Sequence, residues 1–358
     1  LKKKLSTQML VNKGDVGNIT VMSPKDLRIN LKKKIFSYLS VALVEIIKIN
    51  KSIRNSHLSL SIFGSGLVDT LNNSDADIIH LHWLQREMFS IEEIGRIKKP
   101  IVWTLHDMWA FSGAEHYPIN ERWIEGYYDH NKPKNEKGID IDRLIWNKKN
   151  KNWKKKINII CPSNWLADCV RKSKLMKNWP VSVFPNPINI DFWKPIDKKF
   201  AREKLNLPLD KKLILFSSFG GIKDYRKGFD LFLKALSVLN DKNTINDLNI
   251  ILLGQEESFE RYKLKFQFHN LGNIQNENHL KLIYNASDLL ALPSRQDNLP
   301  NTAVEAHSTG VPVISFKIGG IPDIVEHKVT GYLAKPFDIE DMARGIEWIF
   351  HNEKLYKL

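Results

Sequence analysis

Short apolar runs alternate with helix-like patterns along most of the chain, and this alternation constrains the fold more than any other feature. Each run has the length of one strand, while the segments between the runs carry apolar residues at helical spacing. The predicted strands are Asp77–Leu81, Ile101–Leu105, Ile157–Cys161, Val181–Phe184, Leu213–Ser217, Ile250–Leu253, Leu289–Leu292 and Val311–Phe316. The predicted helices include Ile91–Lys98, Trp165–Lys172, Asp230–Leu239, Asn278–Ala286, Thr302–Ser308 and Ile339–Phe350. Strands that alternate with helices favour parallel sheets covered on both faces, so we expect an α/β fold.

Two α/β halves are expected, because 358 residues exceed the size of one compact core. The break falls at Pro185-Asn186-Pro187, where two prolines after a strand predict an extended connector. The strand pattern restarts at Leu213. We therefore predict a first domain at residues 1–185 and a second at residues 186–358. Ligands are expected in the crevice between them, beyond the carboxyl ends of the strands.

The bulk composition is that of a globular chain in a reducing compartment. Hydrophobic residues make up 42% of the sequence, which excludes a disordered protein. The two cysteines cannot form a disulfide framework, which favours the cytoplasm. The longest apolar stretch, Ile35–Ile49, is interrupted by Ser37, Ser40 and Glu45. We interpret it as an amphipathic helix rather than a membrane span.

The net charge of +14 would attract nucleic acids, anionic lipids or anionic substrates. A chain rich in Lys, Asn and Ile, with its lysines on solvated faces, is the simpler explanation. The segment Trp146–Lys156 interleaves Trp146 and Trp153 with six lysines and could equally rest on an anionic membrane surface. Charge alone therefore does not identify a partner.

The segment Leu292–Ser315 is the most informative for chemistry, because a strand leads through a polar loop into a short helix. Asp297 lies in the loop and Glu305 in the first turns of the helix. The start of a helix favours an anion such as a diphosphate, and a carboxylate beside it can accept hydrogen bonds from ribose or sugar hydroxyls. Each acid also has a structural interpretation. Thr302 and Glu305 have the spacing of a capping box, and Asp297-Asn298 that of a turn.

A second polar segment, Phe219–Asp230, follows the predicted strand Leu213–Ser217 and leads into a helix. Its glycines let the backbone approach a phosphate, and Arg226 and Lys227 can neutralise the phosphate charge. An ordinary solvated basic turn is the alternative interpretation.

Imidazoles follow two predicted strands of the first half. His80 and His82 lie at the end of one strand, and His106 followed by Asp107 lies at the end of the next. A lone histidine is usually structural, but a His-Asp pair at a strand end is well placed for polar chemistry. The Asp75-Ala76-Asp77 sequence precedes its strand and has no accompanying ligand cluster, so no metal site is predicted.

The segment Leu292–Ser315 resembles the donor site of family 4 glycosyltransferases, in which two acids eight positions apart precede a Gly-x-Pro-Val strand. The form Gln296–Thr302 resembles capsular, exopolysaccharide and colanic-acid-type enzymes. The resemblance implies that Glu305 holds the nucleotide ribose. It also implies that the donor sugar is faced by Asp297, Asn298, Leu299, Pro300 and Asn301. Many relatives have Glu where Asp297 stands.

The same resemblance extends over nearly the whole chain. It makes Arg226 and Lys227 the diphosphate clamp, although many relatives carry a further Arg where Ile222 stands. It places His106 beside the donor sugar, near the reacting centre, with Asp297. We expect the first strand and a Gly-rich loop to be missing, so that Thr7–Val11 forms the second strand, and we expect the last helices to be missing after residue 350.

The function implied by this resemblance is a retaining glycosyltransferase of GT-B architecture, with two Rossmann-like domains facing across a cleft. It would move a sugar from a nucleoside-diphosphate donor to a glycan or lipid-linked glycan, in cell-surface polysaccharide biosynthesis. Positive side chains and helix amides would stabilise the leaving diphosphate, so neither a metal nor another cofactor is expected. The expected location is cytoplasmic and peripheral on the inner face of the cytoplasmic membrane. The expected partners include an anionic membrane surface and no nucleic acid.

Four other classes of protein were compared with these residues. An epimerase or phosphorylase of the same architecture would need other acids or a cofactor lysine. A glycoside hydrolase using Asp297 and Glu305 would leave Arg226 and Lys227 without a role. A nucleic-acid-binding protein would concentrate its basic and aromatic residues in one groove. A Rossmann dehydrogenase would carry a Gly-x-Gly-x-x-Gly sequence after a strand.

Overall fold

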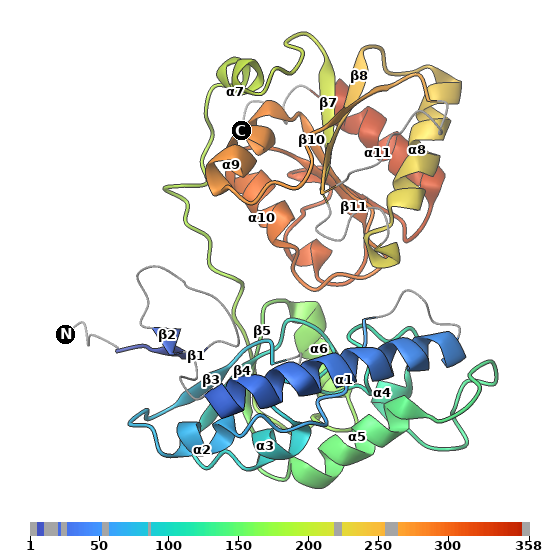
Figure 1. The fold of residues 1–358 in the computed structure, drawn as a ribbon. Coiled ribbons are helices and arrows are strands. Elements are labelled where there is room, and N and C mark those ends of the chain that lie inside the picture. Colours follow the sequence, from blue (N-terminus) through green and yellow to red (C-terminus); the bar gives the residue numbers. More distant parts are fainter. Residues whose placement is uncertain are drawn as a thin grey trace. The chain divides into compact units, whose positions relative to one another are not determined.

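The computed structural model describes residues 6–10, 21–22, 27–51, 57–84, 87–217, 224–254 and 264–352 (Figure 1). The chain forms two compact units. The first comprises Leu1–Ile160 and Asp168–Ser182, and the second comprises Cys161–Ala167 and Val183–Leu358.

The first unit contains a four-stranded sheet in the order β3-β4-β5-β6. These strands are β3 (Ile79–Leu81), β4 (Ile101–Thr104), β5 (Asn158–Cys161) and β6 (Val181–Val183). β4 runs parallel to β3 and to β5. A separate parallel pair is formed by β1 (Met9–Leu10) and β2 (Val21–Met22). β1 lies inside the predicted strand Thr7–Val11, of which Val11 is outside the described residues.

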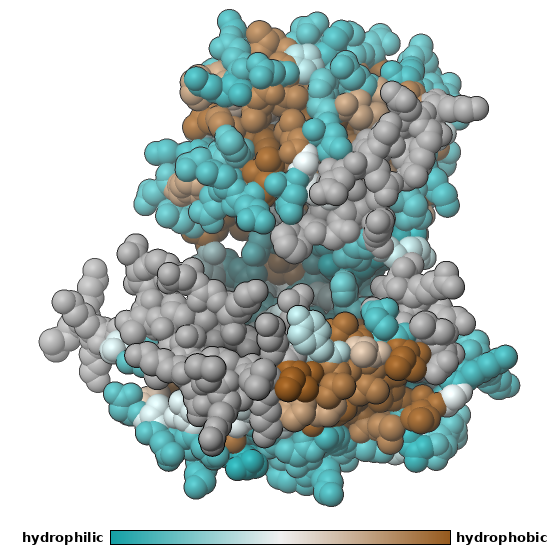
Figure 2. Space-filling view, viewed as in Figure 1, coloured by the Kyte–Doolittle hydropathy of each residue, from teal (hydrophilic) through white to brown (hydrophobic). Residues whose placement is uncertain are grey.

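The helices of the first unit include the long predicted amphipathic helix and several shorter ones. They are α1 (Leu27–Lys51), α2 (Leu67–Asn72), α3 (Ile91–Gly95), α4 (Arg122–Glu125), α5 (Ile141–Asn152) and α6 (Asn164–Lys172). The first four residues of α6, Asn164–Ala167, belong to the second unit. Figure 2 shows hydrophobic surface where Figure 1 draws α1. α3 begins with a full capping box, in which Ser90 and Glu93 each bind the other's backbone N–H. None of the described helices combines the length and apolar character needed to cross a bilayer.

The interpretation of Trp146–Lys156 as a membrane-contacting segment is wrong for its aromatic residues, because both Trp146 and Trp153 are buried. Lys149 is also fully buried, and its Nζ lies 3.9 Å from the centre of the Trp109 ring. That Nζ donates hydrogen bonds to the carbonyl oxygens of Trp109, Ser112 and Gly113. Burial holds the pKa of Lys149 well below its usual value. This part of α5 therefore fixes the chain after β4.

The second unit is a six-stranded parallel sheet in the order β12-β11-β10-β7-β8-β9. Its strands are β7 (Lys212–Ser217), β8 (Leu248–Leu253), β9 (Gln267–Asn270), β10 (Leu289–Leu292), β11 (Val313–Phe316) and β12 (Gly331–Ala334). The chain builds outwards from β7 to β9, returns to β10 beside β7, and builds outwards again to β12. β7 and β10 therefore form a topological switch point, where open α/β sheets bind ligands.

Helices cover both faces of this sheet (Figure 1). α8 (Phe229–Lys242) and α11 (Ile339–His351) pack on one face, and α7 (Lys198–Lys204), α9 (Glu277–Ala286) and α10 (Asn301–Ser308) lie on the other. Strand residues alternate between the two cores: Ile214 and Phe216 pack with α8, whereas Leu213 and Leu215 pack with α9 and α10. The predicted α/β fold with two Rossmann-like units is confirmed.

The sequence did not predict the two edge strands, β9 and β12. β9 is only partly buried, and its sequence, Gln267-Phe268-His269-Asn270, lacks an apolar run. An edge strand has one neighbour rather than two, so it needs less apolar surface and leaves a weaker pattern.

Replacing Lys149 by Met should lower the free energy of unfolding by about 2–4 kcal/mol, because three buried carbonyl groups lose their donor. Lys151→Met, on the same helix but exposed, is the control and should change it by less than about 0.5 kcal/mol. Urea unfolding followed by tryptophan fluorescence measures both. Equal effects of the two changes would contradict the assigned role of Lys149.

Candidate functional site

Two loops leave the switch point of the second unit, one after β7 and one after β10. The first contains the predicted clamp and the second contains the predicted sugar-facing residues. Of the clamp segment, Phe219 to Lys223 lie outside the described residues. Its remaining part forms a short 3-10 helix, η2 (Tyr225–Lys227), whose N-terminus is capped by the Asp224 carboxylate.

The loops are joined by ion pairs to Asp297, which is 7% exposed. Its Oδ2 accepts hydrogen bonds from Lys227 Nζ at 2.7 Å and from an Arg226 guanidinium nitrogen at 3.3 Å. Burial alone would raise the pKa of Asp297, but Lys227 and Arg226 hold that pKa below its ordinary value. Asp297 is therefore ionised. It binds two cations instead of serving only as a turn residue, the alternative considered from the sequence.

The same loops are tied through their backbones. The N–H of Arg295 donates to the carbonyl oxygen of Arg226 at 2.7 Å, and the Arg226 side chain donates to the Gln296 carbonyl oxygen at 3.0 Å. Gly228 follows η2 with φ +68°, and a Cβ on it would lie 1.9 Å from the Pro293 carbonyl oxygen. Only glycine allows this conformation and this approach together.

Replacing Gly228 by Ala should therefore separate the two loops and lower the free energy of unfolding by about 1–3 kcal/mol. If the loops form the predicted diphosphate clamp, the change should also abolish any thermal shift caused by nucleoside diphosphates. Gly272→Ala is a matched control, because Gly272 also has φ +68° but a Cβ there meets no described atom within 4 Å. Gly272→Ala should lower the free energy of unfolding only by the cost of the strained backbone, and it should leave any nucleotide-induced thermal shift unchanged. Thermal unfolding with and without nucleoside diphosphates measures both effects, and unimpaired binding in Gly228→Ala would contradict the role of this contact.

Glu305 lies at a different place, on the second turn of α10. Its Oε2 accepts a hydrogen bond from the Tyr284 hydroxyl at 2.7 Å. Burial raises the pKa of Glu305, while the bond from Tyr284 acts in the opposite direction. The helix begins after Pro300, so Thr302 is not its N-cap and the capping-box interpretation of Glu305 is wrong. Pro300 stands immediately before the first helical residue, and this explains why the helix begins earlier than a capping box at Thr302 would require.

Glu305 borders a pocket of about 320 Å³ in the second unit. The lining residues are Asn186, Pro187, Ile188, Asn189, Phe192, Trp193, Glu277, Asn301, Val304 and Glu305. Across this pocket, Asn186 Nδ2 donates to Asn301 Oδ1 at 2.9 Å. Carboxylates, amides and aromatic rings together suit a ligand with hydroxyl groups and a flat ring.

The predicted donor residues thus fall into three groups. Asn301 and Glu305 line the pocket, whereas Arg226, Lys227 and Asp297 form the ion-paired cluster. Asn298, Leu299 and Pro300 are buried, and Asn298 Oδ1 accepts a hydrogen bond from Ser163 Oγ of the same unit at 2.5 Å. These three residues support the loop.

Tyr284, Trp193 and Asn186 were not assigned to the site from the sequence. Tyr284 binds Glu305 and packs edge-on against Trp193, with 5.7 Å between their ring centres. Asn186 belongs to the proline-rich connector that had marked the domain boundary. That asparagine between two prolines was a usable signal, but a tyrosine near the end of an amphipathic helix carries none.

His106 belongs to the first unit, where it forms a cluster with two other histidines. Its Nε2 lies 3.1 Å from His82 Nδ1, and the His80 and His82 rings are 4.4 Å apart. Burial lowers the pKa of His82 to about 4, aided by His80 and His106. Burial also lowers the pKa of His106, although Asp107 opposes this. Both imidazoles are therefore neutral at pH 7, so one ring donates to the other.

Asp107 lies beside this cluster in a chain of hydrogen bonds. His116 Nδ1 donates to Asp107 Oδ2 at 2.7 Å, and His116 Nε2 lies 2.8 Å from Ser59 Oγ. Burial acts to raise the pKa of Asp107, but His116, the Trp109 N–H and His106 together lower it below its ordinary value. Ser59 donates its backbone N–H to the Ala114 carbonyl oxygen. This chain anchors the segment after His106 to the loop before α2. No local sequence pattern marks Ser59 or His116 as partners of Asp107.

The neutral histidines predict a pH dependence. When the pH falls below 6.5, the unfolded chain takes up protons at His82 and His106, but the folded chain does so only at lower pH because their pKa is depressed. Stability should therefore fall between pH 6.5 and about 4. His82→Asn should flatten this part of the melting-temperature profile. The exposed His130, replaced by Asn as the control, should leave it unchanged, and equal profiles for all three proteins would refute the assignment.

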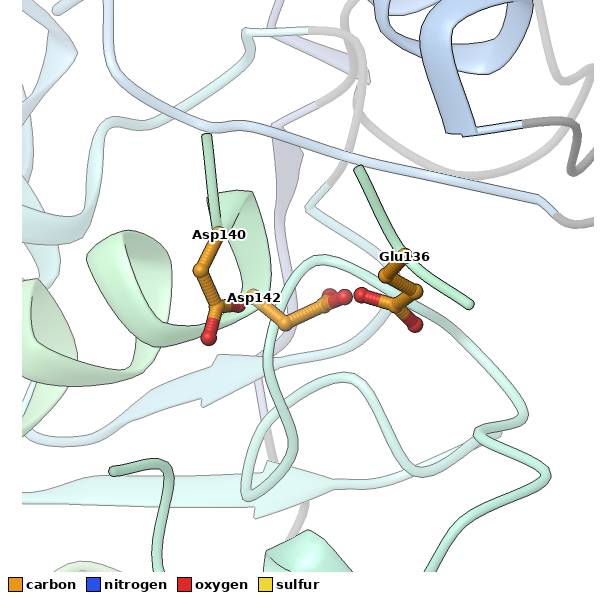
Figure 3. A group of neighbouring side chains, drawn as sticks. All are labelled: Glu136, Asp140 and Asp142. Carbon is orange, nitrogen blue, oxygen red and sulfur yellow. The ribbon is translucent and has the colours of Figure 1, made fainter. Parts of the chain in front are cut away.

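Among the described residues, Glu136, Asp140 and Asp142 lie close enough together to share an ion (Figure 3). The carboxylates of Asp140 and Asp142 already have other partners. Asp140 pairs with Arg122 at 2.5 Å and caps α5, and Asp142 accepts a hydrogen bond from the Ala114 N–H. We assign these acids to the packing of α5.

Two units with parallel sheets are the architecture of the GT-B fold, and comparison with solved structures supports this fold. Sucrose-phosphate synthase of Thermosynechococcus elongatus matches with a TM-score of 0.60 and 19% identity, over 82% of this chain and 71% of that chain. The Anabaena HepE structure in complex with UDP and glucose matches with a TM-score of 0.59 and 17% identity, over 94% and 78%. At such identities the likeness concerns the fold.

Family models make the assignment more specific. The model "Glycosyltransferase Family 4" matches residues 18–192, and "Glycosyl transferases group 1" matches residues 197–357. Together they match most of the chain, which belongs to this glycosyltransferase family.

Curated relatives agree with this assignment. An uncharacterized glycosyltransferase of Haemophilus influenzae is 33% identical, over 41% of this chain and 42% of that protein. An uncharacterized 41.2 kDa protein in the cps region of Klebsiella pneumoniae is 25% identical, over 83% and 76%. An Escherichia coli UDP-Gal:α-D-GlcNAc-diphosphoundecaprenol α-1,3-galactosyltransferase is 26% identical, over 52% and 50%.

Proposed function

We propose that this protein transfers a sugar from a nucleoside-diphosphate donor to a hydroxyl of a glycan or lipid-linked glycan, with retention of configuration. The observation that carries the proposal is the pairing of a hydroxyl-binding pocket at Glu305 with the cations Arg226 and Lys227, at the switch point of one sheet. A nucleotide needs both features, one for its ribose and one for its phosphates.

Glu305 is proposed to hold the ribose. Its carboxylate can accept hydrogen bonds from two vicinal hydroxyls, while the Tyr284 hydroxyl fixes its orientation at 2.7 Å. Trp193 and Phe192 offer aromatic surface to the base on the same pocket wall. Asn186 and Asn301 add amide groups that can bind further polar atoms of the ligand.

Arg226 and Lys227 are proposed to stabilise the diphosphate as it leaves. Asp297 holds both cations in place, and an arriving diphosphate would share them with this carboxylate. Negative charge builds up on the leaving group while the anomeric carbon becomes oxocarbenium-like. Arg226 and Lys227 would then neutralise the negative charge that a metal ion neutralises in other enzymes. We therefore propose that no metal is required.

His106 is proposed to contact the sugar as a neutral hydrogen-bonding group. Its ring is oriented by His82, and its carbonyl oxygen accepts a bond from the Tyr117 hydroxyl at 3.3 Å. Same-face attack by the acceptor hydroxyl would give retention.

The acceptor is proposed from the relatives. One of them acts on a diphosphoundecaprenol-linked sugar and another is encoded in a cps region, so we propose a role in cell-surface polysaccharide synthesis at the cytoplasmic face of the membrane.

A nucleotide screen tests the donor site. One of UDP, GDP, ADP, CMP and dTDP, added with EDTA at roughly 100 times its Kd, should raise the melting temperature by about 5–10 °C. Glu305→Ala should abolish the shift, because the ribose loses its acceptor. Glu326→Ala, an exposed acid on another loop, should preserve it. A well-folded protein that responds to none of these nucleotides would overturn the proposal.

A further inference from the structure

Arg295, on the loop after β10, contacts both the short helix η2 and the start of α8. Its backbone N–H donates to the Arg226 carbonyl oxygen at 2.7 Å, and its Nη1 donates to the Tyr225 carbonyl oxygen at 2.8 Å. Its guanidinium carbon lies 3.7 Å from the centre of the Tyr225 ring. Nη1 and Nη2 also donate to the two carboxylate oxygens of Asp230, in the first turn of α8, at 2.8 and 2.7 Å. One side chain therefore fixes the segment that carries both clamp cations.

Apolar burial does not hold η2 in place. None of its three residues is buried, and Tyr225 is 50% exposed. The Arg295 side chain is more enclosed, at 17% exposed. A bidentate pair between a guanidinium and a carboxylate fixes the orientation of both groups, and stacking on an aromatic ring restricts the guanidinium further. The position of η2 therefore depends on polar contacts, of which Arg295 makes several.

The ion pairs with Asp297 also hold Arg226 and Lys227, but a bound diphosphate would compete for the same two cations. These pairs would therefore weaken as the ligand arrives. Arg295 donates instead to two backbone carbonyl oxygens and to Asp230. A diphosphate is itself an acceptor and has no use for these acceptors, so the contacts of Arg295 persist in the bound state.

The charge of Arg295 is already paired with Asp230. The hydrogen bonds and the charge of Arg295 hold the pKa of Asp230 below its ordinary value, so this carboxylate is ionised at neutral pH. The pair leaves the positive charge of Arg226 and Lys227 to meet the phosphates. The contacts of Arg295 thus suit a residue that orients the clamp rather than one that binds the ligand.

We propose that Arg295 is a positioning residue for the diphosphate clamp. It holds η2 so that Arg226 and Lys227 keep the arrangement that selects a nucleoside diphosphate over the monophosphate. This inference deepens the proposed function and rests on its donor site. A loop that is held in its binding arrangement before the ligand arrives loses less conformational freedom on binding, so Arg295 adds affinity for the second phosphate without touching it.

Calorimetric titration of the full chain in EDTA with UDP and UMP, GDP and GMP, ADP and AMP, and dTDP and dTMP tests the proposal. For the pair that binds, the diphosphate should bind at least about tenfold more tightly, because the second phosphate adds charge-assisted hydrogen bonds. Arg295→Gln should reduce this ratio at least about fivefold while the Kd of the monophosphate changes less than about threefold. Arg344→Gln is the control, since Arg344 pairs with Asp341 on its own helix, α11, and it should leave the ratio unchanged.

Two further variants separate positioning from direct phosphate binding. Arg295→Lys keeps the positive charge but loses the planar fork, so it should lower the ratio as Arg295→Gln does. Asp230→Ala removes the acceptor of that fork and should also lower the ratio. A guanidinium that bound phosphate directly would be freed by Asp230→Ala and would bind the diphosphate more tightly. A ratio that Arg295→Lys preserves, or that Asp230→Ala raises, would therefore overturn the proposal.

Equal weakening of monophosphate and diphosphate binding by Arg295→Gln would also overturn it, because Arg295 would then support the unit as a whole. The ratio of the two Kd values does not depend on the fraction of folded protein, so partial misfolding of a variant does not mimic the expected result. An unchanged ratio in Arg295→Gln would contradict this inference alone and leave the donor site standing. Absence of binding by every pair in the unchanged protein would overturn the donor site, and this inference with it.

Discussion

The buried carboxylate of Asp297 is the constraint on which the second unit's site depends. A lone buried charge costs several kcal/mol, so this carboxylate requires cations, and Lys227 and Arg226 supply them from the loop after the neighbouring strand. The loops can approach because Gly228 carries no side chain. Sheet order, glycine placement and ion pairing thus together bring the two loops into contact. The pocket beside Glu305 is lined by α10, the helix that follows the second loop.

The two units use opposite electrostatics. The second unit gathers full charges at its switch point, which suits a diphosphate. In the first unit, burial and mutual repulsion keep His82 and His106 neutral, so they offer hydrogen bonds without charge. The buried Lys149 and the hydrogen bond that His116 donates to Asp107 hold the chain after His106 in place. The proposed glycosyl transfer would use both environments, one for the departing diphosphate and one for sugar hydroxyls.

Much of the fold could be predicted because most inner strands are buried on both faces and are therefore largely apolar. The predicted β10 strand, Leu289–Leu292, has the same bounds in the structure. The edge strand β9 carries no such run and was not predicted. The segment Trp146–Lys156 was misinterpreted because a lysine was assumed to be solvated, whereas Lys149 is buried against three carbonyl groups.

The sequence by itself determined the order of strands and helices and placed Asp297 in a loop and Glu305 in a helix, because these follow from local spacing. Only the tertiary structure decided their partners. Asp297 meets Lys227, 70 positions away, and Glu305 meets Tyr284, 21 positions away, instead of capping its own helix. Side-chain partners this far apart in the sequence depend on which strands become neighbours in the sheet. They also depend on which loops can approach each other because a glycine carries no side chain. Local sequence spacing contains neither kind of information.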